Sequence, residues 1–309
     1  MSILAIGTVA FDAIETPFGK VDRILGGSAT YITLAARYFA EDLRLSAVVG
    51  HDFPSSDLDL FHKNGINTDG LIMDLSGKTF FWSGKYHMDL NNRDTLRTDL
   101  NVLATFDPKL PESYLDSEII CLGNLDPSIQ LAVLDQLHQP ELVVLDTMNY
   151  WIERTPAELD KVLKRADVLI INDAEARQLA KVPNLIKAAR IIQAMGPRYL
   201  VIKKGEHGAL LFGEDQIFSA PALPIEDVVD PTGAGDSFAG GFVGYLASVE
   251  QYDFESLKLA VIYGSTMASF NVEAFGPERL LHLTRSEIAR RADRFRMLGA
   301  IPEEVFEAI

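Results

Sequence analysis

Short apolar segments alternate with amphipathic segments along most of the chain. The apolar segments are rich in β-branched residues and stop at a turn or polar residue, which is typical of buried parallel strands. They span 3–7, 45–50, 118–123, 142–146, 168–172 and 199–205. Between them, apolar residues recur every three or four positions, which predicts helices over 29–42, 128–138, 159–166 and 184–195. The alternation predicts an α/β fold in which helices cover both faces of a mostly parallel central sheet.

In such sheets ligands bind at the carboxyl ends of the strands, so polar residues at those ends are candidate site residues. They are Asp12, Asn124, Asp126, Asp146, Asn149, Asn172, Glu175, Lys203 and Lys204. We therefore expect a binding site along this edge of the sheet.

Two segments interrupt the alternation. Residues from about 12–25 and 71–103 alternate polar and apolar positions with a period of two and contain no helix of the expected length. We expect them to form a small β-sheet that projects as a lid from a single domain spanning 1–309. Near the C-terminus the pattern predicts helices and a final turn over 234–248, 253–270, 284–296 and 302–308.

Composition and charge exclude several classes of protein. Hydrophobic residues make up 48% of the 309 residues and charged residues 23%, which is ordinary for a folded globular protein. The net charge of −16, with no basic patch, disfavours nucleic acids and anionic membranes as partners. A single cysteine, Cys121, excludes an intramolecular disulfide, and no long apolar segment predicts a membrane span or a signal peptide. We expect a cytoplasmic protein.

The strongest chemical signal is DVVDPTGAGDSFAGGFVGYLA, residues 227–247. A turn containing proline and glycine leads into a predicted helix, and the amides of Gly233, Ala234 and Gly235 at its start can converge on an anion such as phosphate. Asp236 can either cap the helix or accept a proton from a hydroxyl that attacks a bound phosphoryl group. The segment lacks the lysine of a P-loop, and no dinucleotide fingerprint follows the first strand, which disfavours an NAD-dependent oxidoreductase.

This segment resembles the C-terminal signature of the ribokinase-like (PfkB) family of carbohydrate kinases. The resemblance covers nearly the whole chain: Gly26 and Gly27 resemble the family's di-glycine hinge, INDAEA (171–176) its N-x-x-E motif, and IKKGEHGALLF (202–212) its nucleotide-binding strand and turn. It implies a ribokinase-like three-layer sandwich with a β lid. It also implies an ATP-dependent kinase that phosphorylates a hydroxymethyl group of a sugar or sugar-like molecule.

The resemblance assigns a role to individual residues. Asp236 would be the catalytic base, with Gly233, Ala234 and Gly235 as the anion hole. The candidates for binding the acceptor substrate are Asp12, Gly26, Gly27, Tyr31, Asn124, Asp126 and Asn149. The candidates for binding ATP are Asn172, Glu175, Lys203, Lys204, Gly205, Gly208 and Gly264.

The same resemblance implies metal ions. Glu175 would orient Mg²⁺ through water, because Mg²⁺ keeps much of its hydration shell. Asp230 and Thr232 resemble positions that frame a monovalent-cation site, for K⁺, in some members. From the residues alone, Asn172 followed by Glu175 also fits an ordinary helix cap.

Departures from the family pattern bear on the substrate. Ribokinases carry asparagines that hold ribose where this chain has Ala10 and Tyr31, so ribose is disfavoured. Tyr31 can stack on a substrate ring or pack against the lid. Gly264 stands where many members carry an asparagine that contacts adenosine.

Two alternatives to a sugar kinase stay open. The aromatic lid segment FFWSGKY (80–86) and Tyr31 can embrace a base, which favours a nucleoside kinase. Phe80, Trp82 and Tyr86 share one face of a strand and can equally form the core of a lid-to-lid homodimer. A non-catalytic sensor of nucleotide or sugar on the same fold is the alternative from another functional class.

Overall fold

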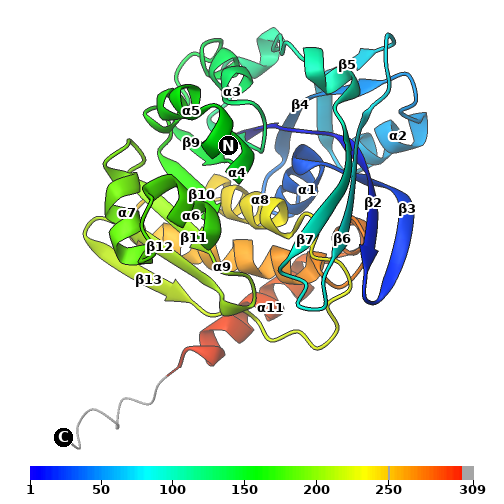
Figure 1. The fold of residues 1–309 in the computed structure, drawn as a ribbon. Coiled ribbons are helices and arrows are strands. Elements are labelled where there is room, and N and C mark those ends of the chain that lie inside the picture. The colour runs from blue at the N-terminus through cyan, green and yellow to red at the C-terminus, as the bar shows by residue number, and fades with distance from the viewer. Residues whose placement is uncertain (250, 301–309) are drawn as a thin grey trace, which may run out of the picture.

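A nine-stranded sheet forms the centre of the computed structural model, which describes residues 1–249 and 251–300 (Figure 1). Its strands are β1 (Ser2–Ile6), β4 (Asp42–Gly50), β5 (Ile66–Asp74), β8 (Ile119–Leu122), β9 (Leu142–Asp146), β10 (Val168–Asn172), β11 (Tyr199–Lys203), β12 (Ala209–Gly213) and β13 (Gln216–Ala220). Their order is β13-β12-β11-β10-β9-β8-β1-β4-β5. Only β12 and β13, at one edge, run antiparallel to their neighbours. The prediction of a mostly parallel central sheet is confirmed.

Helices cover both faces of this sheet. One layer contains α1 (Ser28–Ala36), α2 (Ser55–Lys63), α8 (Ala234–Ala247), α9 (Phe254–Asn271), α10 (Glu278–Leu281) and α11 (Arg285–Leu298). The other contains α3 (Pro127–Leu134), α4 (Asn149–Arg154), α5 (Pro156–Leu163), α6 (Asp173–Ala180) and α7 (Leu185–Gln193). Short 3-10 helices are η1 (Asn101–Thr105), η2 (Glu112–Tyr114) and η3 (Gly205–His207).

The apolar core is divided by the sheet into two parts. Along β1, Ile3 and Ala5 pack in the core beneath α1, α8 and α9, whereas Leu4 and Ile6 pack in the core beneath α3, α5, α6 and α7. Because both faces of the strands are buried, their sequences are continuously apolar rather than alternating. The three-layer α/β sandwich is therefore as the sequence predicts.

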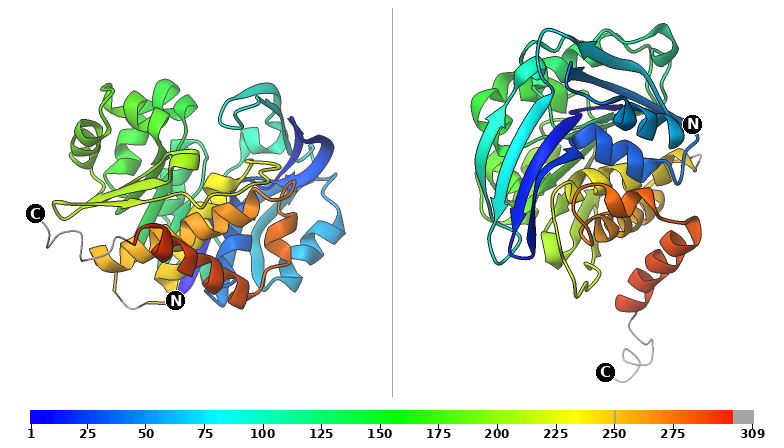
Figure 2. Two further views of the ribbon diagram at one scale, coloured as in Figure 1. Left: turned by 90° about the horizontal axis from the view of Figure 1, so that it is seen from below. Right: turned by 90° about the vertical axis from the view of Figure 1, so that its right-hand side faces the viewer.

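A separate four-stranded sheet, the lid, lies along one side of the molecule (Figure 2). It contains β2 (Ala10–Thr16), β3 (Gly19–Gly26), β6 (Phe80–Tyr86) and β7 (Arg93–Asp99), in the order β3-β2-β6-β7. The β2/β3 and β6/β7 pairs are antiparallel and the β2/β6 pair is parallel. The predicted hinge, Gly26 and Gly27, lies where β3 leaves the lid and α1 begins.

Three predicted boundaries need correction or fall outside the described residues. The sequence predicts the second lid segment over 71–103, but 71–74 complete β5 and pair with β4 in the central sheet. The helix predicted over 29–42 ends at Ala36, since β4 begins at Asp42. The turn predicted near 302–308 lies outside the residues that the structure describes.

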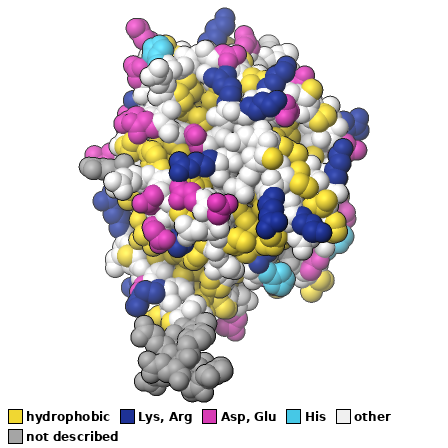
Figure 3. Space-filling view, turned by 90° about the vertical axis from the view of Figure 1, so that its left-hand side faces the viewer, with side chains coloured by type: hydrophobic (Ala, Val, Ile, Leu, Met, Phe, Trp, Pro, Cys, Tyr) yellow, Lys and Arg dark blue, Asp and Glu magenta, His cyan; other side chains and the backbone are white. Residues whose placement is uncertain are grey.

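Two further features are the distribution of charged side chains on one face and the hydropathy of the helices. On the face in Figure 3, basic and acidic side chains are interspersed, and the basic ones form no continuous patch there. Within residues 1–249 and 251–300, every helix is too short or too polar to cross a bilayer.

Candidate active site

The turn before α8 leaves backbone amides available for an anion. Gly233 is the N-cap residue with a φ of 76°, in the left-handed region, and a side chain there would collide with the ring of Tyr31. Among the described residues, the amides of Gly233 and Gly235 have no hydrogen-bond acceptor. The amide of Ala234, expected in the same anion hole, instead donates to the carbonyl of Pro231 at 3.2 Å. Two of the three predicted amides therefore remain available.

Adjacent strand ends bring a lysine and two carboxylates close to Asp236, the carboxylate in the first turn of α8. Asp146 ends β9, Glu175 lies in the first turn of α6 after β10, and Lys203 ends β11. The Nζ of Lys203 lies 2.9 Å from the position that a Cβ on Gly235 would take. Asp236, in the first turn of α8, completes the group. The predicted binding edge of the sheet thus gathers acidic groups and one ammonium beside the anion-binding amides.

The pKa values of this cluster are shifted by burial and by mutual interaction. Burial and the Asp146 carboxylate raise the pKa of Asp236 to about 7, although Lys203 and Arg93 oppose the shift. Burial and Asp146 likewise raise the pKa of Glu175 to about 7. Burial disfavours the charge on Lys203, but the surrounding carboxylates outweigh it and raise its pKa. Asp236 can therefore exchange a proton near neutral pH while Lys203 stays charged.

Asp12 supplies a further carboxyl group from the lid. It is 5% exposed, and burial, followed by the charges of Asp230 and Asp236, raises its pKa to about 8 against the opposing amide of Gly27. Gly26 is needed here because a side chain at that position would occupy the place of the Asp12 carboxylate. The predicted hydroxyl-binding acid and the predicted base thus lie in one site.

Tyr31 lies beneath the same turn. Its ring packs against Gly233, and its buried hydroxyl has no hydrogen-bond partner among the described residues. Burial and the charges of Asp12, Asp230 and Asp236 raise its pKa well above the usual value. The hydroxyl is therefore a neutral donor or acceptor close to the carboxyl groups.

The inner face of the lid is aromatic and is turned toward the site. Asp12 pairs with Trp82 across β2 and β6, and Tyr86 lies on the same face of β6. The hydroxyl of Tyr86 accepts a hydrogen bond of 3.1 Å from that of Thr232, in the turn before α8. Tyr86 is therefore covered by the chain's own site, whereas Phe80 and Trp82 on the same face are only half-buried, and a homodimer through the lid stays a prediction.

Asp230 and Thr232 brace the turn before α8. The fully buried carboxylate of Asp230 accepts the amides of Thr232 at 2.8 Å and Gly276 at 3.1 Å. The carbonyl of Thr232 accepts the side-chain amide of Asn271 at 2.7 Å. These bonds fix the course of the chain into the anion-binding turn.

Asn172 and Glu175 cap a helix, and Glu175 also belongs to the cluster of carboxylates. Oε2 of Glu175 accepts the amide of Asn172, and Oδ1 of Asn172 accepts the amide of Glu175, each at 2.8 Å. This capping box fixes the start of α6. The same carboxylate interacts with Asp146 and Lys203, so the cap also places it in the cluster.

Of three further predicted acceptor-binding residues, two have local hydrogen-bond partners and one is exposed. Asn124 accepts the indole Nε1 of Trp151 at 2.9 Å. Asp126 is the N-cap of α3 and accepts the amide of Ser128 at 2.8 Å. Asn149 is exposed at the start of α4. Within the described part of the chain, no hydrogen bond joins them to Asp12 or Asp236.

The turn predicted to bind the nucleotide is formed, but Gly264, also predicted to bind ATP, is buried. The amide of Lys204 donates to the carbonyl of Gly208 at 2.8 Å and closes the turn that contains Gly205. Gly264, by contrast, is buried where α9 crosses α8, against the backbone of Phe238. The expectation that Gly264 lines the nucleotide is therefore replaced by a role in close helix packing.

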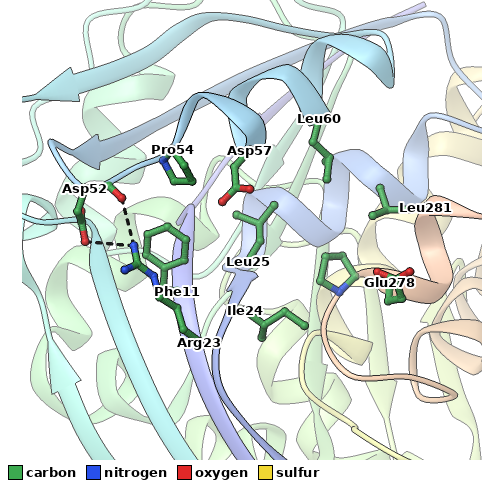
Figure 4. A pocket seen from close by; sticks show the side chains of 11 residues that line it. Phe11, Arg23, Ile24, Leu25, Asp52, Pro54, Asp57, Leu60, Glu278 and Leu281 are labelled. Carbon is green, nitrogen blue, oxygen red and sulfur yellow. Dashed lines mark hydrogen bonds and ion pairs between the residues drawn. The ribbon is translucent and has the colours of Figure 1, made fainter.

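A cavity of about 510 Å³ lies behind the lid hinge, away from these residues (Figure 4). Its wall includes Phe11, on the lid face opposite Asp12, and Arg23, whose guanidinium lies 3.8 Å from the centre of the Phe11 ring. Arg23 also donates to the carbonyl of Asp52 at 3.1 Å. None of the predicted site residues lines this cavity, so it is separate from the candidate active site.

Sequence reasoning missed several residues that the fold brings to the site. Asp146 was recognised only as a strand-end residue, without a role. The sequence indicates Tyr86 only as part of an aromatic face, and it gives no indication of Arg93. No local motif marks Arg93, and only the register of β6 and β7 brings it to this face.

In sequence and in structure, the chain is similar to several kinases. The cytidine kinase of Thermococcus kodakarensis is 28% identical over 256 residues, covering 79% of this chain and 88% of that protein. The nucleoside kinase of Methanocaldococcus jannaschii is 25% identical over 289 residues, covering 92% of this chain and 90% of that protein. The structure of a ribokinase from Thermotoga maritima aligns with a TM-score of 0.73 at 19% identity, over 95% of this chain and 99% of that one. The fold is thus ribokinase-like.

The family model for the pfkB family carbohydrate kinase matches residues 2–282. That match includes the lid, the central sheet and the turn into α8, and it leaves out only α11 among the described helices. The chain therefore belongs to the pfkB family of carbohydrate kinases, which are ATP-dependent phosphotransferases.

Proposed function

We propose that this kinase phosphorylates the primary hydroxyl of a nucleoside. The observation that carries the proposal is the inner face of the lid, where Asp12 pairs with Trp82 and lies on the same face as Tyr86. A carboxyl group beside flat aromatic rings suits a substrate with both hydroxyls and a base, because a planar base can stack over those rings while a hydroxyl binds the carboxyl group. The relatives named cytidine kinase and nucleoside kinase support this choice.

The residues account for phosphoryl transfer in the following way. The acceptor hydroxyl, held by Asp12, attacks the γ-phosphorus of ATP while its proton passes to the carboxylate of Asp236. A bond forms between the acceptor oxygen and phosphorus, and the bond from phosphorus to the bridging oxygen breaks, with its electron pair leaving on ADP. The amides of Gly233 and Gly235 and the ammonium of Lys203 stabilise the charge on the transferred group.

A magnesium ion fits the cluster of carboxylates. Asp146 raises the pKa of both Glu175 and Asp236, and a divalent cation would relieve this repulsion. Glu175 and Asp146 would hold Mg²⁺ through water, and the ion would neutralise charge on the phosphates of ATP. A K⁺ ion at Asp230 and Thr232 would share the Asp230 carboxylate with the two backbone amides that its oxygens already accept.

The acceptor preference is the first prediction. With ATP and Mg²⁺, cytidine, inosine, adenosine and uridine are offered beside ribose, fructose and inositol, with ADP release measured by a coupled assay and the product by phosphorus NMR. We expect kcat/KM for the best nucleoside to exceed that for every sugar by about 10²-fold or more, since a sugar leaves the aromatic surface unfilled. A sugar or polyol that surpasses all nucleosides would overturn the proposal, and binding without turnover would favour a sensor.

The pH dependence is the second prediction. Asp236 must be deprotonated to accept the acceptor's proton, and its pKa is raised to about 7 by burial and Asp146. We expect kcat/KM to be highest above that pH and to fall as the pH is lowered through about 7, because the fraction of ionised base falls. The measurement is the initial rate at subsaturating acceptor across this range. A rate that stays constant well below pH 7 would show that Asp236 is not the titrating base.

A further inference from the structure

Arg93 lies on the inner face of the lid with the acceptor-binding residues. It is the first residue of β7 and pairs with Tyr86 across the β6/β7 ladder. Paired residues share a face of the sheet, and the face of Tyr86 also carries Trp82 and Asp12. The guanidinium of Arg93 lies 5.8 Å from the centre of the Trp82 ring. The register alone therefore directs this side chain to the active-site side of the lid.

Arg93 differs from neighbouring lid cations in having no acidic partner. Lys85 pairs with Glu15 at 2.7 Å, and Arg97 pairs with Asp99 at 2.6 Å. Arg93 forms no ion pair or side-chain hydrogen bond with any residue in 1–249 or 251–300. Its charge nonetheless reaches the cluster, since it helps to hold down the pKa values of Asp236 and Glu175.

Two residues shortly before Arg93 bring the lid close to the rest of the site. Before it in sequence, the hydroxyl of Tyr86 bonds to that of Thr232 in the turn that leads to Asp236. Also just before it, at the tip of the β6–β7 hairpin, Oδ1 of Asn91 lies 2.7 Å from the place of a Cβ on Gly205, in the nucleotide turn. The hairpin thus bonds to the turn before Asp236 and comes close to the nucleotide turn, and Arg93 lies next to both places.

We propose that Arg93 is a further catalytic residue whose guanidinium contacts the phosphoryl group during its transfer from ATP to the acceptor. A planar guanidinium can bind two oxygens of such a group, and the charge is spread over those oxygens in the transition state. Because Arg93 belongs to the lid, this positive charge is supplied when the lid covers the acceptor and excludes water. The inference rests on the phosphoryl-transfer role of Asp236 and is independent of whether the acceptor is a nucleoside.

The test compares Arg93→Met with Arg97→Met, a matched change on the same strand whose side chain packs over Phe81 on the outer face. Thermal unfolding checks that both variants fold. The affinity for ADP with Mg²⁺ is measured with and without aluminium fluoride, a mimic of the transferred phosphoryl group. The kinetic constants are measured with the best acceptor of the wild-type enzyme, and Arg93→Lys is added to keep the charge without the planar fork.

We expect Arg93→Met to bind ADP as the wild type does but to lose the extra affinity conferred by aluminium fluoride. Its kcat falls roughly 10²-fold with the KM for the acceptor little changed, Arg93→Lys regains part of the loss, and Arg97→Met behaves as the wild type. A raised acceptor KM with unchanged kcat would mean that Arg93 binds the acceptor, and equal behaviour of the two methionine variants would also overturn the proposal. Failure of the nucleoside assignment is seen separately, in the wild-type acceptor screen.

Discussion

Replacing Asp236 by asparagine is expected to lower turnover by about 10²–10⁴-fold while ATP binding is retained. The amide has nearly the shape of the carboxylate and keeps the first turn of α8, but it cannot accept the proton of the acceptor hydroxyl. The measurement is kcat with the best acceptor, together with the Kd for ATP from titration. Because Asp146 raises the pKa of Asp236, the variant is also expected to remove the fall in rate near pH 7.

A matched control is Asp253→Asn, which changes an exposed aspartate that caps α9 by accepting the amide of Ser256 at 2.8 Å. Asparagine caps helices about as well as aspartate, so this variant should retain full turnover. Near-wild-type turnover of a folded Asp236→Asn enzyme would remove the base from the mechanism.

The second large effect is expected for Gly233→Val. A β-branched residue resists the φ of 76°, at a cost of about 1–3 kcal/mol, and its side chain would collide with the ring of Tyr31. The turn must shift, which moves the free amides of Gly233 and Gly235 away from the phosphoryl group. We expect turnover to fall by about 10²–10³-fold, measured beside the Kd for ATP and the midpoint of thermal unfolding.

Gly65→Val separates backbone strain from loss of the anion hole. Gly65 also has a positive φ, of 73°, but no atom lies within 4 Å of the Cβ position there. We therefore expect Gly65→Val to lower the midpoint of thermal unfolding about as much as backbone strain alone does in Gly233→Val, while its turnover stays unchanged. If both glycine variants retained turnover, the turn at Gly233 would not be the phosphate-binding site.

The sequence predicts the six inner strands of the central sheet, from β11 to β4, because they are largely buried on both faces and are therefore recognisable as apolar segments, whereas the more exposed edge strand β13 is not predicted. It fails at residues 71–74 for a physical reason. There β5 is an edge strand with exposed positions, and the polar residues that precede 71–74 within it make its sequence unlike the continuously apolar inner strands. Only its pairing with β4 distinguishes it from a lid strand.

The sequence predicts those site residues that lie close together in short motifs. Asp236 with its glycines and Asn172 with Glu175 are defined by short spacings, so the sequence identifies them. The side chain of Arg93 lies on the site face of the lid because of the register between β6 and β7. A shift of one residue would turn it to the other face, and the amino-acid composition does not determine that register. For Asn124 and Asp126 the sequence predicts a contact with the acceptor, but each forms a local hydrogen bond. A position at the end of a strand predicts which edge of the sheet a residue lies on, and it does not predict what its side chain binds.

The active site can form only late in the synthesis of the chain, because its residues come from both ends of the sequence. Asp12 and Asp236 interact in one pocket, yet 224 positions separate them in the chain. At about 5–20 residues per second, a ribosome needs roughly 10–45 s to make the intervening segment. During that interval the aromatic face of the lid lacks the turn that covers it, and this exposed surface invites misassociation or chaperone binding. Phosphoryl transfer therefore cannot begin on the nascent chain until α8 has emerged and docked.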